Sequence, residues 1–266
     1  MKGSQATVAS AEGPTDQDPT DDPSLPFAER GHARPLLDGD AFSYACQGCG
    51  GCCRDKIIPV NPYEVLRLAR ARGLSTTELL ADAVHPSRPS LRFDERGWCS
   101  FFEQGRCGVH LDRPLACRLY PLGRQRDAQG HELYWRLQPR EHSPGVYGED
   151  GRVADYLAGQ DVAPHIAAAN RYQALYYRVH DLLAQLMARA PTADPRPHRI
   201  AALVSEDEAA LFEVDMPGFQ SWFDIDAVVD ELCRRRRTPK PADLDALVDL
   251  HIEAVQDWLD EAARAI

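Results

Sequence analysis

The sequence lacks the long apolar runs and the excess of positive charge that would point to membranes or nucleic acids. No apolar stretch approaches the about 20 residues that cross a bilayer, so we expect no membrane partner. Residues 1–26 lack the apolar core of a secretory signal, which predicts a cytoplasmic location. The 41 Asp and Glu outnumber the 30 Lys and Arg, and a net charge of −11 argues against a nucleic-acid partner, because phosphates need a basic surface.

Common enzyme motifs are missing as well. The chain contains no Walker loop, no G-x-S-x-G, no H-E-x-x-H and no G-x-G-x-x-G. Such motifs cradle phosphates, activate a serine or hold a catalytic zinc. Hydrolase, NTPase and dinucleotide-binding functions therefore have no support in the sequence, and no catalytic residue is predicted.

Cysteine is the residue that the sequence concentrates in one region. Seven of the eight cysteines lie in residues 46–117, and four of them form the run Cys46-Gln-Gly-Cys49-Gly-Gly-Cys52-Cys53. A C-x-x-C pair is a short chelate loop, and neighbouring glycines let backbone N–H groups turn toward the sulfurs. Thiols in a reducing cytoplasm are more often metal ligands than disulfides. The run therefore predicts a cysteine-bound metal or iron–sulfur centre.

The remaining clustered cysteines bring the number of candidate thiol ligands to seven. Cys99 and Cys107 flank an expected tight turn, and Cys117 lies on an expected short helical turn. A zinc site or a typical iron–sulfur cluster takes four ligands, so seven thiols and one further group would complete two centres. One centre with spare thiols is the leaner alternative. Thiolates suit both zinc and iron, including a 4Fe-4S or 2Fe-2S cluster, and the metal stays open.

The cysteine spacing resembles a known family. Three stretches carry the resemblance: Cys46-x2-Cys49-x2-Cys52-Cys53, Cys99-x7-Cys107, and Arg113-Pro114-x2-Cys117-Arg118-x-Tyr120-Pro121. Together they are similar to the YkgJ-type CxxCxxCC family, described as a zinc- or iron-chelating domain, over roughly residues 42–148. The resemblance implies that all seven cysteines are metal ligands.

The resemblance also implies an eighth ligand. The family pattern continues with a cysteine before a Pro-Gly pair, and here His142 lies close to that position, ahead of Pro144 and Gly145. Imidazole can replace thiolate on zinc or iron, so His142 is the candidate, and a histidine in a surface loop is the alternative. His110, three residues after Cys107 in a C-x2-H spacing, is a weaker candidate.

Three functions remain open at this point. The first is a metal-binding protein that chelates zinc or iron, with an iron–sulfur cluster as one form of the centre. The second is a cluster-dependent enzyme for redox chemistry or protein side-chain modification, such as lysine N-methylation, because a flagellin lysine N-methylase carries a similar cysteine cluster. The third is a metal-stabilised interaction module with a protein partner.

The chain divides by composition into three parts. Residues 1–38 are rich in Pro, Asp, Ser and Thr and predict a disordered tail. Residues 39–150 form the chelating domain, whose sparse apolar periodicity suggests that the metal stabilises it. Residues 151–266 predict a helical region. The expected fold is mainly α, an irregular metal-stabilised cysteine-cluster domain with short strands and a helical C-terminal region.

Local patterns predict individual elements. Asn61 and Ser75 are N-cap candidates for helices over 62–72 and 77–83. Apolar residues at helical spacing predict one long helix over 151–190, and further helices are expected at 223–236 and 241–263. Alternation predicts a strand over 131–137, residues 41–56 read as a loop, and 191–198 as a linker.

Four other side chains or groups carry separate expectations. Arg113 and Arg118 flank Cys117 and would hold an anion or pair with local acids, Asp112 or Glu103. Cys233 is expected to be a packed thiol. The basic run Arg234–Arg237 is expected to be a solvated helix end, where positive charge complements the helix dipole.

Overall fold

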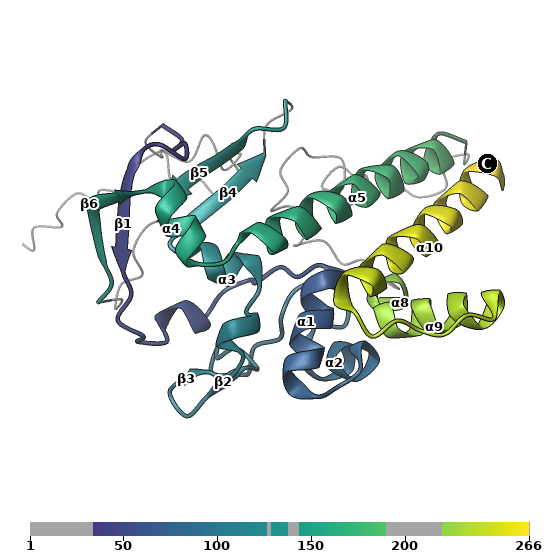
Figure 1. Cartoon of the computed structure of the whole chain (residues 1–266), viewed down its shortest axis with the longest axis horizontal. Coiled ribbons are helices and arrows are strands. Elements are labelled where there is room, and N and C mark those ends of the chain that lie inside the picture. The colour runs from purple at the N-terminus through teal and green to yellow at the C-terminus, as the bar shows by residue number, and fades with distance from the viewer. Residues whose placement is uncertain (1–33, 127–128, 138–143, 190–219, 266) are drawn as a thin grey trace, which may run out of the picture. The chain divides into compact units, whose positions relative to one another are not determined.

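The computed structural model describes residues 34–126, 129–137, 144–189 and 220–265. The predicted tail up to residue 33 and the linker at 191–198 lie outside these residues. The described part belongs to one compact unit that starts at Arg34. About half of the structure is helical, and short antiparallel strands accompany the helices (Figure 1). None of the helices in the described part combines the length and apolar character of a membrane span.

The elements follow in chain order. They are β1 (Ala41–Ala45), η2 (Gly51–Cys53), α1 (Pro62–Arg72), α2 (Thr76–Ala83), β2 (Phe102–Glu103), β3 (Arg106–Cys107), η3 (His110–Asp112), α3 (Leu115–Leu119), β4 (Leu122–Arg126), β5 (Glu132–Arg136), β6 (Val146–Arg152), α4 (Val153–Gly159), α5 (Ala163–Arg189), α8 (Gln220–Phe223), α9 (Ile225–Arg236) and α10 (Leu244–Ala265).

Helices α1 and α2 begin with the capping boxes that the sequence predicts. The Asn61 side chain accepts from the Glu64 amide at 3.1 Å, and the Glu64 carboxylate accepts from the Asn61 amide at 2.9 Å. Ser75 and Glu78 form the same reciprocal pair at the start of α2. Gly73 ends α1 with a φ of 69°, a left-handed conformation that favours glycine. Both helix predictions are confirmed.

The strands form three separate two-stranded antiparallel sheets: β1 with β6, β2 with β3, and β4 with β5. The strand predicted over 131–137 is confirmed as β5. The prediction of a loop from residue 41 was wrong for β1, because Ala41–Ala45 pairs with Val146–Arg152 from a distant part of the chain. The sequence of β6, VYGEDGR, has little apolar alternation, so its own pattern does not predict a strand.

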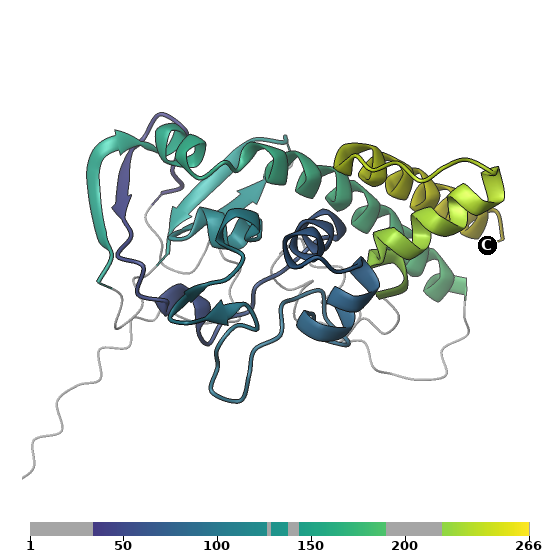
Figure 2. The same cartoon turned by 60° about the horizontal axis from the view of Figure 1, so that its bottom comes forward.

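The long helix predicted over 151–190 is divided. α4 ends at Gly159, and α5 begins at Ala163 after Asp161, whose φ is 51°. The helical character of the C-terminal region is confirmed, and α5, α9 and α10 lie side by side in Figure 1 and Figure 2. The domain boundaries predicted at residues 38 and 150 stay predictions. A backbone hydrogen bond crosses the first of them, from the Leu36 amide to the Tyr134 carbonyl at 2.7 Å.

Helix α1 faces two hydrophobic cores at once. Val65, Leu68 and Ala69 pack into a first core with α2, and half-buried cysteines 99, 107 and 117 border that core. Tyr63 and Leu66 pack into a second core with α5, α9 and α10. A third core joins β1, α3, β4, β5 and α4. The cysteine segments therefore rest on a helix that the C-terminal helices also cover.

A buried polar network ties α2 to α9. The Asp226 carboxylate accepts from the Thr76 amide at 2.8 Å, from Arg70 at 2.8 Å and from Lys240 at 2.8 Å. Asp224 accepts from the hydroxyl of Thr76 at 2.5 Å and caps α9 through the Ala227 amide. Hydrogen bonds to buried carboxylates from charged and backbone donors are strong, so this network fixes α9 against the start of α2.

Candidate metal centre

Five of the predicted ligand cysteines gather in one place. Cys52, Cys53, Cys99, Cys107 and Cys117 lie close enough for their thiolate charges to affect one another. Cys52 and Cys53 are in direct contact, and their Sγ atoms are 3.9 Å apart. All five cysteines are half-buried, so each of them is only partly exposed to solvent.

Backbone hydrogen bonds join the segments that carry these thiols. Gly50, with a φ of 76°, starts the turn of η2, and the Cys53 amide donates to its carbonyl at 2.8 Å. The Cys99 amide donates to the Cys53 carbonyl at 2.9 Å. The β2–β3 hairpin pairs Phe102 with Cys107, and the Phe102 amide donates to the Cys99 carbonyl at 2.8 Å. The backbone thus holds the three segments together independently of the sulfurs.

Cys117 enters the group from the short helix α3. The buried guanidinium of Arg118 holds this helix by donating to backbone carbonyls: that of Arg113 at 3.0 Å, that of Gln160 at 2.9 Å and that of Leu111. Arg113 donates to the His110 carbonyl and to the Gln160 side chain. The two arginines therefore fasten the loop and helix around Cys117.

Of the two alternatives for these arginines, pairing with Asp112 or Glu103 was wrong, and holding an anion stays a prediction. Asp112 accepts from Arg67 at 2.7 Å, and Glu103 accepts from Arg72 at 2.6 Å. The carboxylate nearest to Arg118 is that of Asp161, at 3.9 Å. The physical reason is burial, because the enclosed guanidinium of Arg118 satisfies its donors with carbonyl oxygens beside it.

Cys46 and Cys49 are exposed, and the structure does not bring them into the five-thiol group. Each sulfur accepts a backbone bond inside the glycine-rich loop, from Gly48 and from Gly51, both at 3.4 Å. The predicted eighth ligand, His142, lies outside the described residues. These three groups therefore stay predicted ligands.

The charges around the thiols determine which of them ionises first. The hydrogen bond from Cys53 lowers the pKa of Cys52, against the effect of burial, and the cations of Lys56 and Arg113 lower it further. The same hydrogen bond, with burial, raises the pKa of Cys53. Burial also raises the pKa of Cys99, Cys107 and Cys117. A bound cation would favour the thiolate form of Cys53, Cys99, Cys107 and Cys117, because positive charge stabilises the ionised sulfur.

A zinc or iron ion would supply that positive charge, and the donor chemistry fits it, since both metals bind thiolates. In the described part of the chain, no group of three or more His, Cys, Asp or Glu side chains already has the arrangement that holds an ion. The donors are therefore assembled in one region, and the thiols would have to draw closer together around a metal.

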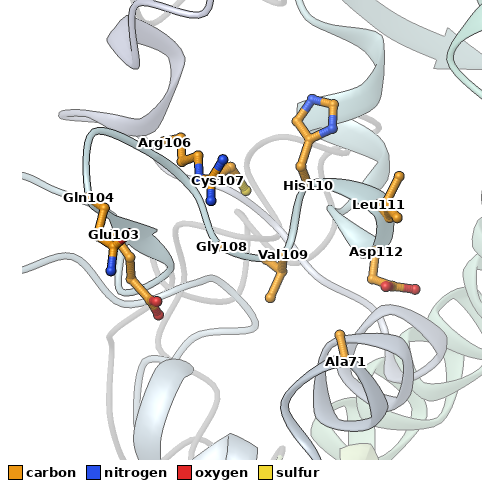
Figure 3. A pocket seen from close by; sticks show the side chains of 10 residues that line it. All are labelled: Ala71, Glu103, Gln104, Arg106, Cys107, Gly108, Val109, His110, Leu111 and Asp112. Carbon is orange, nitrogen blue, oxygen red and sulfur yellow. The ribbon is translucent and has the colours of Figure 1, made fainter.

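A hollow of about 840 Å³ opens beside Cys107 (Figure 3). The hairpin β2–β3, η3 and α1 form its walls, and Figure 3 shows Glu103 and Gln104 across from Leu111. Leu111 is 80% exposed. His110 also lines the hollow, and burial, with the cations of Arg113 and Arg118, lowers its pKa. Solvent and small solutes can approach the Cys107 side of the group through this opening.

Two residues near the group were missed by the sequence reasoning. Lys56 places its ammonium 3.8 Å from the centroid of the Tyr120 ring. Its positive charge acts to lower the pKa of Cys52 and of Cys117. Glu64 is 3% exposed on α1, and it accepts from the Leu115 amide at the start of α3. An acid among the apolar residues of a helix, three residues after Asn61, is a signal that could have identified Glu64. No such signal marks Lys56.

Comparison with known proteins gives one match. Residues 45–137 match the family model named CxxCxxCC, whose description reads "Putative zinc- or iron-chelating domain". No curated protein and no solved structure matched the chain. The matched range contains all seven clustered cysteines and ends before His142. The predicted resemblance is confirmed over this range.

Proposed function

We propose that the chain binds zinc or iron as thiolate complexes, because residues 45–137 match the family model described as a zinc- or iron-chelating domain. The observation that carries the proposal is the gathering of five thiols from η2, the segment before β2, β3 and α3. Sulfur donors from separate segments around one point are typical of structural zinc and of iron–thiolate sites.

The proposed ligands divide into an inner and an outer set. Cys52, Cys53, Cys99, Cys107 and Cys117 are the inner set. Cys46, Cys49 and His142 are the outer set. Together with one cysteine of the Cys52–Cys53 pair, they would form a second four-ligand centre. Neighbouring cysteines rarely bind the same ion, which favours sharing Cys52 and Cys53 between two centres. The bound metal would supply the positive charge that stabilises the thiolates, while Lys56 and Arg113 offset the excess negative charge of the sulfurs.

We further propose that the metal stabilises the fold locally. The cysteine-bearing hairpin has strands of two residues each, and the segment before it is held by isolated bridges such as Phe93 with Cys99. Such short strands contribute little stability alone. A structural metal site can contribute on the order of 10 kcal/mol to folding. The third function considered from the sequence, a metal-stabilised module, is compatible with this role.

An iron–sulfur cluster is the second candidate, and one observation favours it. The amides of Gly48 and Gly51 donate to the sulfurs of Cys46 and Cys49. Backbone N–H bonds to cysteine sulfurs are among the contacts that tune the potential of such clusters. These bonds also occur around single metal ions, so the metal itself must be measured.

The test is anaerobic purification with metal and acid-labile sulfide analysis and a visible spectrum. Zinc or iron without sulfide supports the first candidate, and iron with equimolar sulfide and visible absorption supports the second. Cys99→Ser and Cys117→Ser should lower the metal content, whereas Cys233→Ala should not, because Cys233 lies in the second core. Metal-free parent protein that also fails to bind added zinc or iron would refute both candidates.

A further inference from the structure

We infer that Glu64 is a positioning residue for the proposed metal centre, because its carboxylate fixes the start of α3 and, through it, the thiol of Cys117. The inference rests on the proposed function. Glu64 is not one of the predicted ligands. It acts through the backbone of Leu115 rather than on the sulfur of Cys117 itself.

The Glu64 carboxylate uses both oxygens for backbone amides of two different segments. Oε2 accepts from the Asn61 amide at 2.9 Å, which closes the capping box of α1. Oε1 accepts from the Leu115 amide at 2.6 Å, which belongs to α3. A carboxylate accepts on both oxygens, whereas a neutral carboxamide accepts on one and donates from the other. The residue type is therefore matched to this double contact.

Helix α3 depends on such an external contact. It has five residues, and its N-cap position is Pro114, which forms no side-chain cap hydrogen bond within the described residues. The first amides of a helix have no partner inside the helix, and a helix this short is not stable alone. Glu64 satisfies the first amide, that of Leu115, two residues before Cys117. Arg118 holds the other side of the same helix.

The surroundings of the carboxylate leave little room for water to take over this role. Glu64 is 3% exposed, and the fully buried His165 places Nδ1 at 3.8 Å from Oε1. The rings of His165 and Tyr63 pack edge to face, with centroids 5.3 Å apart. A buried donor that loses its acceptor costs more than an exposed one. Loss of the Glu64 contact should therefore displace the start of α3.

The chain supplies a matched control. Glu78 occupies the same third helical position in the capping box of α2, and its carboxylate accepts from the amide and hydroxyl of Ser75. It makes no contact with α3 among the hydrogen bonds of the described residues. Glu64→Gln and Glu78→Gln make the same chemical change in the same local motif. The two positions differ in the contact with Leu115 and in burial, since Glu64 is buried and Glu78 is exposed.

The experiment measures cobalt(II) binding by the sulfur-to-metal absorption, and the rate at which iodoacetamide alkylates Cys117 in the metal-free protein. Glu64→Gln should weaken cobalt binding by about 10- to 100-fold, as loss of an outer partner of a ligand typically does. It should also speed alkylation of Cys117 relative to Cys99. Glu78→Gln should leave both values at those of the parent. If Glu64→Gln does not fold, Glu64→Asp, which keeps the charge but is one methylene shorter, should give the same selective losses.

The two readouts separate this inference from the proposed function. If the parent binds cobalt and Glu64→Gln binds it equally well, the positioning role is refuted while the metal site stands. If the parent binds none of cobalt, zinc and iron, the proposed function fails, and alkylation alone decides the positioning of the thiol. An unchanged Cys117 rate in the folded variant would then overturn the inference.

Discussion

The amide of Cys99 donates to the carbonyl of Cys53 at 2.9 Å, which links two cysteine segments that flank α1 and α2 in the chain. This bond uses backbone atoms, so it survives any change of the two side chains. Substitution of a single sulfur should therefore alter metal binding before it alters the path of the chain.

The first prediction concerns the ranking of the cysteines. Cys117→Ser should reduce the metal content more than Cys49→Ser, because Cys117 lies within the five-thiol group and Cys49 is exposed. Metal analysis of the two variants, purified side by side with the parent, checks the order. A larger loss in Cys49→Ser would show that the glycine-rich loop holds the principal ligand.

The second prediction concerns removal of the metal. A chelator should increase amide hydrogen exchange first in residues 85–113, where two-residue strands and isolated bridges form the backbone contacts. Exchange in α9 and α10 should change later, because these helices pack in the second core. Hydrogen exchange followed by mass spectrometry, with metal loss verified, is the measurement. Equal protection before and after metal loss contradicts a stabilising role.

The third prediction concerns Asp226 and acid. Burial alone would raise the pKa of its carboxyl, but hydrogen bonds from Arg70 and Lys240 outweigh it and hold the pKa at about 2, below the ordinary 3.8. The carboxylate therefore stabilises the fold fully above the ordinary pKa, and this contribution is lost as the pH falls from about 4 to about 2. We expect a loss of about 1–2 kcal/mol over this range, allowing for partial solvent screening.

Asp226→Asn provides the comparison for this effect. The asparagine cannot lose a charge on acidification, so the difference in unfolding free energy between parent and variant should shrink as the pH falls from 5 toward about 2. Urea denaturation at a series of pH values measures it. A difference that stays constant with pH would contradict the prediction.

The fourth prediction concerns the buried imidazole of His251. Its Nε2 lies 2.7 Å from the Trp222 carbonyl and its Nδ1 lies 3.0 Å from the Tyr172 hydroxyl, so the neutral ring donates to the first and accepts from the second. Burial lowers the pKa of His251 to about 4. As the pH falls from about 6.5 to 4, His251 is protonated in the unfolded chain but stays neutral in the folded chain. This difference lowers the free energy of unfolding by up to about 3 kcal/mol.

His251→Gln tests this effect because glutamine does not titrate. The parent should lose stability relative to the variant as the pH falls from about 6.5 to 4, and the difference should level off below that range. Denaturant unfolding at fixed pH values measures it. Parallel pH profiles for parent and variant would show that His251 is not the titrating group.

Local patterns predicted the parts of the fold that depend on local contacts. The starts of α1 and α2 follow from Asn61 and Ser75, because a capping box is completed within four residues. Strand β1 could not be predicted in this way, since its partner lies beyond residue 145 and the pairing is set by tertiary contacts. The interruption between α4 and α5 was predictable, because Gly159 at the end of α4 and Pro164 at the second position of α5 are helix stop and start signals, and the apolar spacing was read through both.

The candidate site was predictable in composition but not in arrangement. Spacing identified the seven cysteines and the resemblance to the CxxCxxCC family, and the match to the family model covers the range that contains them. Which thiols gather depends on turns such as the one at Gly50 and on the position of α3, neither of which has a sequence rule. Glu64 was missed because its second partner, Leu115, is distant in the chain.

The two-sided burial of α1 has a consequence for cutting the protein into parts. A fragment that ends at residue 150 would keep all the clustered cysteines but would leave Tyr63 and Leu66 without the helices that cover them. Such a fragment would tend to aggregate through this bare face. A minimal unit with the clustered cysteines, prepared from this chain, should therefore retain α5, α9 and α10. Transfer of the cysteine segment alone to another protein would require a substitute for that cover.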